Sequence, residues 1–263
     1  FQEFAARFSV ENVEGRFHEL EETNDVEAQH IIRLLNQIKQ TPQRVYPSVG
    51  IVAMTLEQRD LIAYYLLKLK QQNAFGSEKI MQLERNGMTV CQLDELFGQQ
   101  FDILIVSCTY GTVNLKGSLT KKLAFLNTPE GVNQMRLLSK MPFQKMYLVH
   151  SLSDENLEKF RSKKHEAGAW LLAHLIQLAE SANSGNKEWL QISMEALGKF
   201  VESKPAKSVF AQEVANALRP YVEENRLVRN ATFAGLPVHL SVKSTAAGEP
   251  PILLHSDGFF AKS

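Results

Sequence analysis

The chain has 263 residues, of which 44% are hydrophobic, and its 29 basic and 29 acidic residues cancel to a net charge of +0. This composition is that of an ordinary globular protein, long enough to form one large core or, as we expect, two modest ones. The balanced charge excludes an overall positive field that would attract nucleic acid, although local basic patches remain possible.

The positions of the cysteines and the hydropathy of the chain indicate the cellular compartment in which the protein is expected. Cys91 and Cys108 both fall in apolar runs typical of buried strands, where a free thiol packs as a small hydrophobic side chain. No apolar run reaches the roughly 18 residues of a membrane span, and the start of the chain lacks the features of a signal peptide. We therefore expect a cytoplasmic protein with no membrane partner and no disulfide framework. Because the chain begins at Phe1 rather than Met, we expect a fragment of a longer protein.

Hydrophobic periodicity predicts alternating helices and strands in the first part of the chain. An amphipathic helix is expected after Asn24 and ends before Pro42. The β-branched run SVGIVAM then leads directly into the helical pattern TLEQRDLIAYYLLKLKQQ. Three more strands are expected at MTVCQL, FDILIVSC and KMYLVHSL, with a weaker helix, NQMRLLSK, before the last. This alternation predicts an α/β domain over about residues 20–160, with a parallel sheet flanked by helices.

The second part of the chain follows a different pattern. Helical periodicity continues from 153 to 224 without a strand, and the small polar stretch 181–186 is expected to be a flexible connector. After Arg226, the runs RLVRNATF, LPVHLSV and PILLHSD have the length and composition of strands. We therefore expect a domain boundary between about 160 and 187, followed by a small α+β domain in which helix precedes sheet.

Three segments of the first part resemble motifs IV, V and VI of superfamily 1 helicases of the nonsense-mediated-decay type, in the order found in their second RecA-like domain. They are SVGIVAMTLEQRDLI at 48–62, LDELFGQQFDILIVSC at 93–108 and VNQMRLLSKMPFQKMYLVHSL at 132–152. The resemblance implies a RecA-like domain over 1–160, a helical connector over 161–186 and a bacterial source. It also implies that a first RecA-like domain belongs to the same parent chain.

The resemblance assigns binding roles to residues of motifs IV and V. Gln58 stands where the family keeps a glutamine. The family's Gln-Gly-Asp/Glu-Glu signature of motif V reads here Phe97, Gly98, Gln99 and Gln100, so the glycine of the turn is kept and the acidic side chains are lost. Nucleotide or nucleic-acid contacts are implied at Gln58 and at the last three of these positions.

Motif VI departs furthest from the family. The family's Asn position is occupied by Arg136, and its Thr-Arg pair by Lys140 and Met141. Losing an arginine finger costs about a thousandfold or more in rate, and a methionine cannot replace a guanidinium; Lys140 offers a weaker phosphate contact. No GxxxxGK[ST] phosphate loop occurs in the chain, so ATP and Mg²⁺ are implied only if a parent chain supplies an intact first domain.

A second resemblance covers 187–263, which is similar to the very-short-patch-repair-like endonuclease domain of a bacterial helicase subfamily. The family's metal-binding acids fall here on Ala211, His239 and His255, with Asp257 as a remaining nearby acid. Mg²⁺ prefers a cluster of carboxylate oxygens, so neither a metal cofactor nor DNA cleavage is expected. The two histidines with Asp257 offer in principle a Zn²⁺ site, but packing roles are favoured.

Two functions from different classes remain. The first is the C-terminal region of a helicase-like protein that associates with DNA or RNA, with weakened or absent ATPase activity and no nuclease activity. The second is a non-catalytic scaffold or partner-binding module that keeps both folds for their shape. In either case the chain by itself is not expected to be catalytic.

Overall fold

The computed structural model describes residues 6–73, 75–96, 98–114, 118–141, 143–162, 167–199, 209–233, 236–244 and 252–254. The chain divides into two compact units, Phe1–Leu197 and Gly198–Ser263. Each unit has its own sheet.

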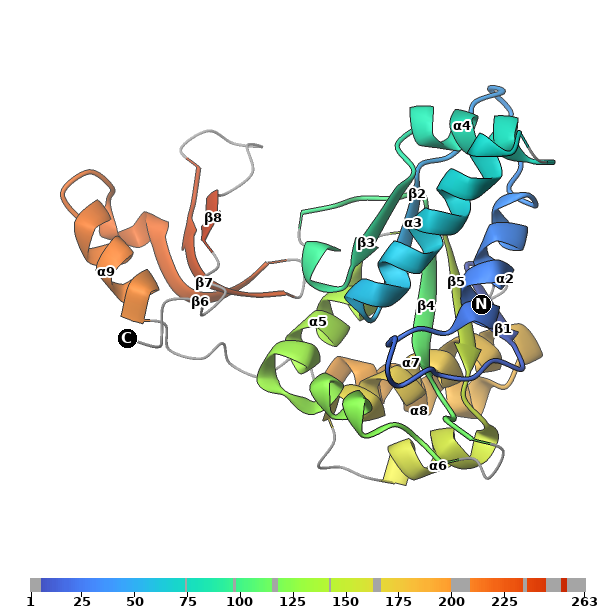
Figure 1. Ribbon diagram of the computed structural model, residues 1–263. Coiled ribbons are helices and arrows are strands. Elements are labelled where there is room, and N and C mark those ends of the chain that lie inside the picture. The colour runs from blue at the N-terminus through green and yellow to red at the C-terminus, as the bar shows by residue number, and fades with distance from the viewer. Residues whose placement is uncertain are drawn as a thin grey trace. The chain divides into compact units, whose positions relative to one another are not determined.

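The first unit is built on a five-stranded parallel sheet in the order β1-β5-β4-β2-β3 (Figure 1). Its strands are β1 (Phe8–Asn12), β2 (Val49–Ala53), β3 (Thr89–Gln92), β4 (Ile103–Gly111) and β5 (Lys145–Ser151). The parallel sheet expected from the alternating pattern is thus confirmed. The central strand β4 is buried along almost its whole length, as expected of a strand covered on both faces.

Helices cover both faces of this sheet (Figure 1). They are α2 (Asp25–Leu35), α3 (Leu56–Gln71), α4 (Ser77–Arg85), α5 (Pro129–Lys140), α6 (Asp154–Ser162), α7 (Ala167–Ser184) and α8 (Lys187–Lys199), with short 3₁₀ turns at Asp94–Leu96 and Lys121–Asn127. The helices α2, α3 and α4 bury Ile31, Ile62 and Ile80 against Ile51 and Val149 of the sheet. On the other face α7 packs against β1, α5 and α6.

The starts of three helices are fixed by the side chain of the preceding residue. Asn24 accepts from the backbone N–H of Glu27 at the start of α2, and Thr55 accepts from that of Gln58 at the start of α3. Thr128 caps α5 in the same way. Such caps satisfy backbone donors that the first turn leaves without a partner. Asn24 and Thr55 therefore fix where the chain turns at the carboxyl end of the sheet.

The end of α7 corrects one expectation. The stretch 181–186 was expected to be a flexible connector, but α7 continues to Ser184, and Ser181 and Ala182 are buried. The helix is apolar around most of its circumference, so tertiary packing overrides the small polar residues of its last turn. The first compact unit extends to Leu197.

Two elements of the first unit are absent from the sequence-based expectations. The edge strand β1 pairs in parallel with β5 from Phe8 to Asn12, and α4 is a nine-residue helix between α3 and β3. The short loop before α4 is made possible by Asn73 and Gly76, which both adopt positive φ angles.

The second unit contains α9 (Val209–Leu218), a 3₁₀ turn at Glu224–Arg226 and the strands β6 (Leu227–Phe233), β7 (Leu236–Val242) and β8 (Ile252–Leu254). The strands form an antiparallel sheet in the order β6-β7-β8, and Ala215 of α9 packs on Leu240 of β7. The expected sequence of helix followed by small sheet is confirmed. In the part of the chain that the structure describes, no helix is long and apolar enough to cross a bilayer.

Candidate functional site at the carboxyl edge of the sheet

The topology singles out one edge of the parallel sheet. After β2 the chain first adds β3 on one side, then returns to place β4 and β5 on the other side. The carboxyl ends of β2 and β4 therefore flank the point where the strand order reverses, which is where open α/β sheets commonly bind ligands. We call the surface formed by residues 13–24, 53–58 and 107–112 the carboxyl edge.

The chain itself closes this edge. The segment from 13 to 24 runs across it: the backbone N–H of Phe17 donates to Thr112 O at 3.1 Å, and Thr55 Oγ1 donates to Glu22 O at 2.7 Å. The Phe17 ring also packs on Tyr110, with centroids 5.5 Å apart. The switch point is thus filled by the protein's own backbone and side chains.

A buried carboxylate lies beneath this segment. Glu27, on the first turn of α2, has no exposed surface. Its Oε2 accepts from Ser107 Oγ and from the backbone N–H of Thr109, both at 2.7 Å, and its Oε1 accepts from Ser151 Oγ at 2.9 Å and Asn24 Nδ2 at 3.1 Å. Thr109 holds its N–H there in a left-handed conformation, φ 58°, which is strained for a β-branched residue. Four donors, from the strands β4 and β5 and from the segment before α2, therefore converge on one side chain.

When Glu27 is ionised, the hydroxyl groups of Ser107 and Ser151 act as hydrogen-bond donors to it. Gln58 Nε2 donates to Ser107 Oγ at 3.1 Å, and Asn24 Nδ2 donates to Ser151 Oγ at 2.6 Å. Each hydroxyl therefore accepts from an amide and gives its own hydrogen to Glu27. Gln58 closes the network by accepting from the Asn24 N–H at 2.7 Å and donating to Asn24 O at 3.0 Å. The six residues Asn24, Glu27, Gln58, Ser107, Thr109 and Ser151 form what we call the Glu27 network.

Burial and hydrogen bonding act on Glu27 in opposite directions. Burial dominates and raises the pKa of Glu27 to about 7, although the bonds from Ser107, Thr109 and Ser151 lower it. Burial, with a contribution from Glu27, also raises the pKa of the Cys108 thiol, so this cysteine stays protonated. The Glu27 network is a structural core with a carboxyl group that changes charge near neutral pH.

The surface above the network is acidic. Four acidic residues and one arginine lie between 13 and 24, and Glu14, Glu19 and Glu21 are exposed. A nucleotide phosphate approaching this edge meets like charges rather than the arginine or lysine side chains that stabilise phosphoryl groups. The carboxyl edge is therefore unsuited to hold ATP without groups from another domain.

The structure places the residues of motifs IV and V in different environments. Gln58 is fully buried in the Glu27 network, with its amide oxygen and nitrogen both occupied. Gly98 has φ +79°, in the left-handed region that a turn with glycine uses, and Gln99 and Gln100 are exposed beside it. Phe97 lies outside the described residues. Among the described positions, Gly98, Gln99 and Gln100 are accessible to a ligand, whereas Gln58 is not.

The residues of motif VI lie along α5. Arg136 is half-buried, its Nη1 lies 3.4 Å from Asn133 Oδ1, and burial lowers its pKa. Lys140 is the last residue of the helix, and Met141, at its C-cap, is buried. The position to which the resemblance assigns the family's arginine thus holds an apolar side chain packed into the protein.

The expected nuclease positions belong to the second unit. Ala211 lies in α9 and His239 in β7, whereas His255 and Asp257 fall outside the described residues. Within the described ranges, no group of three or more His, Cys, Asp or Glu side chains is placed to hold a metal ion.

Glu27 does not stand out from hydrophobic periodicity, but the spacing of the residues around it carries a signal. Asn24 and Glu27 have the spacing of a capping box, in which the glutamate normally reaches back to the N-cap backbone N–H. Here the Asn24 N–H donates to Gln58 Oε1 instead. Glu27 lies on the buried stripe of α2 with Ile31 and Leu34. An acid on the apolar stripe of an amphipathic helix is the pattern that indicates a buried polar network.

Comparison with known proteins adds no identification, because no family model and no curated protein matches the chain.

Proposed function

We propose that the chain is the C-terminal region of a helicase-like protein that associates with nucleic acid and contributes no ATP hydrolysis or nuclease activity of its own. The order of the three motif-like segments supports this proposal, as does the parallel sheet on which they lie. The first unit then corresponds to a second RecA-like domain.

The observation that carries the loss of ATPase activity is the closed, acidic carboxyl edge. Phosphoryl transfer requires cationic side chains and Mg²⁺ around the γ-phosphate. In this chain the segment 13–24 covers the switch point, the Glu27 network uses its polar atoms internally, and Met141 is buried. ATP and Mg²⁺ would have to be held by a first RecA-like domain of a parent chain.

The second unit is assigned in the same proposal to a degenerate endonuclease-like domain. Its order, a helix before three antiparallel strands, is compatible with that assignment. Alanine at 211 and histidine at 239 leave the matching positions without the carboxylates that a Mg²⁺ site needs. The unit would then contribute shape or binding, but no cleavage.

The proposal is tested by measuring two activities of the whole chain. Fluorescence anisotropy with labelled single- and double-stranded DNA and RNA should show binding that weakens as salt rises. Release of phosphate from MgATP should stay at the buffer rate with and without the bound oligonucleotide. Absence of nucleic-acid binding would refute the association, and hydrolysis stimulated by the oligonucleotide would refute the loss of ATPase activity.

A specific surface favours the second candidate, a scaffold or partner-binding module. Helix α8 leaves Trp189, Ile192 and Met194 exposed, at 43%, 39% and 51% of their surface. Exposed apolar side chains gathered on one helix are typical of protein interaction sites. Under this candidate, oligonucleotides of every type should fail to bind, and substitution of Trp189 should abolish capture of a protein partner.

A further inference from the structure

The edge of the sheet opposite the Glu27 network has a contrasting charge. The loop that leads into β2, residues 36–48, and the stretch 61–88 that leads into β3 together carry six lysine or arginine residues and two glutamates. The whole chain, by comparison, has a net charge of +0. Because β2 and β3 are parallel, residues 36–48, the second half of α3 and the following helix α4 lie towards the amino end of the sheet. We call this surface the amino edge.

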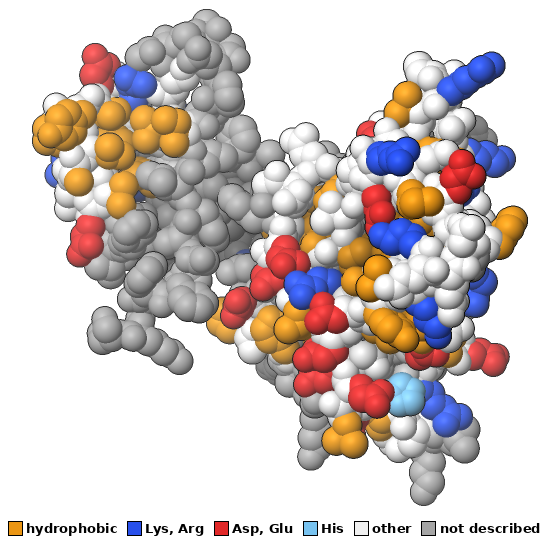
Figure 2. Space-filling model, turned by 45° about the horizontal axis from the view of Figure 1, so that its top comes forward, with side chains coloured by type: hydrophobic (Ala, Val, Ile, Leu, Met, Phe, Trp, Pro, Cys, Tyr) orange, Lys and Arg blue, Asp and Glu red, His pale blue; other side chains and the backbone are white. Residues whose placement is uncertain are grey.

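Contacts join the two stretches into one surface. Lys79 of α4 donates from Nζ to Asn36 O at 2.6 Å and lies over the Tyr46 ring, 5.7 Å from its centroid. Figure 2 shows Lys and Arg side chains predominating over the upper part of the first unit and Asp and Glu over its lower part. Cationic side chains are therefore in excess at the amino end of the sheet and acidic side chains at the carboxyl end, and each end carries some of both.

Exposed aromatic rings accompany these cations. Tyr64 is 54% exposed and Phe75 is 94% exposed. Lys68 Nζ lies 5.9 Å from the centroid of the Tyr64 ring, and Leu67 is exposed on the same side of α3. Tyr64, Leu67, Lys68 and Gln71 are spaced so that they form one exposed stripe along the helix. Rings beside cations offer stacking faces for bases next to contacts for phosphates.

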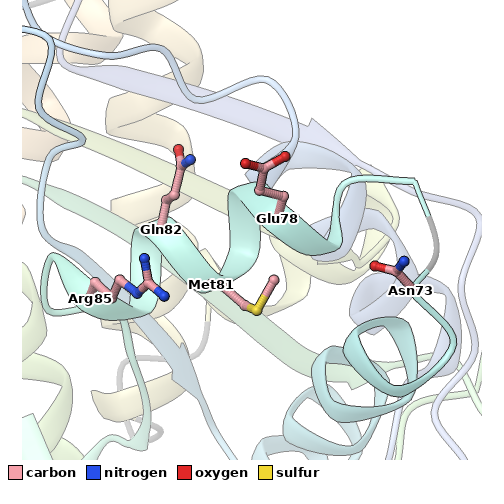
Figure 3. Close-up of a pocket in the computed structure, with 5 residues that line it drawn as sticks. All are labelled: Asn73, Glu78, Met81, Gln82 and Arg85. Carbon is pink, nitrogen blue, oxygen red and sulfur yellow. The ribbon is translucent and has the colours of Figure 1, made fainter.

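A shallow depression of about 350 Å³ lies where α4 faces the end of α3 (Figure 3). It is lined by Asn73, Glu78, Met81, Gln82 and Arg85. The two amide side chains can donate to and accept from base edges, Met81 offers an apolar surface, and Arg85 can contact a phosphate. Glu78 is the acid of this lining, and it can accept hydrogen bonds from base amino groups while it disfavours a phosphate at its own position.

Lys68 and Arg85 are among the cations of the amino edge that are available to a ligand. Lys70 is paired with Glu84 at 2.6 Å, which neutralises both. Among the described residues, neither Lys68 nor Arg85 forms an ion pair. Arg85 lies in the depression and Lys68 on the α3 stripe, so a chain of phosphates that follows the edge can meet both.

We propose that the amino edge binds single-stranded nucleic acid, with Tyr64 and Phe75 stacking on bases and Lys68 and Arg85 contacting phosphates. This assignment rests on the proposed function, and it names the surface that carries the association. The acidic carboxyl edge repels the same strand, so the charge separation also directs the strand to one end of the sheet.

The test is fluorescence anisotropy of the whole chain with a 15-nucleotide labelled oligo-dT and oligo-U. The substitutions are Lys68→Ala with Arg85→Ala, and separately Tyr64→Ser with Phe75→Ser. Lys159→Ala, which removes an exposed lysine of α6, and Tyr221→Ser, which removes an exposed aromatic of the second unit, are the matched controls. All six positions are partly or fully exposed, so thermal unfolding monitored by circular dichroism should confirm unchanged folding.

We expect each double variant to bind about tenfold or more weakly and both controls to bind like the wild type. The cation variant should also flatten the dependence of log affinity on log salt, by about 0.7 for each lost phosphate contact. If both double variants bind the oligonucleotides as tightly as the wild type does, the amino edge is not the binding surface. That result would leave the proposed association with nucleic acid unrefuted. If the wild type binds neither oligonucleotide, both the amino-edge proposal and the proposed function are refuted. Binding to phosphatidylserine vesicles in place of oligonucleotides would also refute both.

Discussion

Glu27 makes the stability of the first unit depend on pH in an unusual direction for a carboxylate. Its pKa is raised from 4.5 to about 7 in the folded protein, so between these values the unfolded chain binds fewer protons at this site. The contribution of Glu27 to stability is therefore highest below pH 4.5, falls as pH rises towards 7, and is constant above that. By linkage the total loss is about 3 kcal/mol.

Substitution Glu27→Gln should remove this pH dependence. Burial lowers the pKa of His150 and of His174 to about 4, which gives the opposite slope below pH 6.5, so the difference between variant and wild type is the useful quantity. In urea titrations, the free energy of unfolding of the variant, relative to that of the wild type, should increase by about 2 kcal/mol between pH 5 and pH 8. A constant difference would show that the four donors keep Glu27 ionised throughout.

Substitution of Gln58 distinguishes a structural role of this side chain from a binding role. Its side-chain amide is the acceptor for the Asn24 N–H and a donor to Ser107, all inside the protein. We expect Gln58→Ala to lower the free energy of unfolding by about 2–4 kcal/mol, because a buried N–H loses its acceptor and a cavity remains. Gln99→Ala, at an exposed position, is the matched control and should have no effect.

Oligonucleotide affinity should be unchanged in folded Gln58→Ala protein. A reduced affinity at unchanged stability would instead restore the binding role that the helicase resemblance implies for this position. The sequence alone could show that Gln58 matches a motif. It could not show that the side chain is buried, because burial depends on Asn24 and Ser107, which are 34 and 49 residues away in the chain.

Among the helices and strands, α7 shows the largest difference between the structure that its local sequence favours and the structure that tertiary packing stabilises. Its polar last turn suggests a connector, yet the helix packs on β1, α5 and α6. Leu172→Ala, at a fully buried position, should therefore destabilise the first unit by about 2–5 kcal/mol, measured by chemical unfolding. Asn183→Ala, at an exposed position of the same helix, should change stability little. Equal, small effects would mean that α7 is not part of this core.

The sequence predicts the elements with strong periodicity and misses those without it. The strands β2, β4 and β5 are apolar runs, and the helices α2 and α3 have buried stripes and side-chain caps. The strand β1 is only five residues long, and its alternation of Phe8 and Val10 with Ser9 and Glu11 is too short to identify a strand by itself. Pairing with β5 stabilises it. The short helix α4 depends on the turn at Asn73 and Gly76 for its start.

At the scale of the molecule, the division at Leu197 predicts which fragments fold. A fragment of residues 1–197 retains α7 with the sheet, so it should unfold cooperatively in calorimetry with a Tm close to that of the first unit in the whole chain. A fragment of residues 1–160 lacks α7 and exposes the face of β1 that this helix covers, so it should aggregate or unfold without a cooperative transition. Cooperative unfolding of the shorter fragment would place the limit of the unit at 160.

The order β1-β5-β4-β2-β3 was also beyond the reach of periodicity, because strand order is set by long-range pairing. That order places the Glu27 network and the amino edge at opposite ends of one sheet. The sequence alone shows that residues 14–27 are rich in acidic residues and that residues 61–88 are rich in basic residues. Only the topology shows that these two stretches lie towards different ends of the sheet.

Hydrogen exchange of the whole chain, followed by mass spectrometry with and without a single-stranded oligonucleotide and MgATP, tests the central claim most directly. With the oligonucleotide we expect slower exchange in peptides covering 36–48 and 61–88, and with MgATP we expect no change in peptides covering 13–24 and 107–112. Protection of the carboxyl edge by MgATP, or of any region other than the amino edge by the oligonucleotide, would contradict the account.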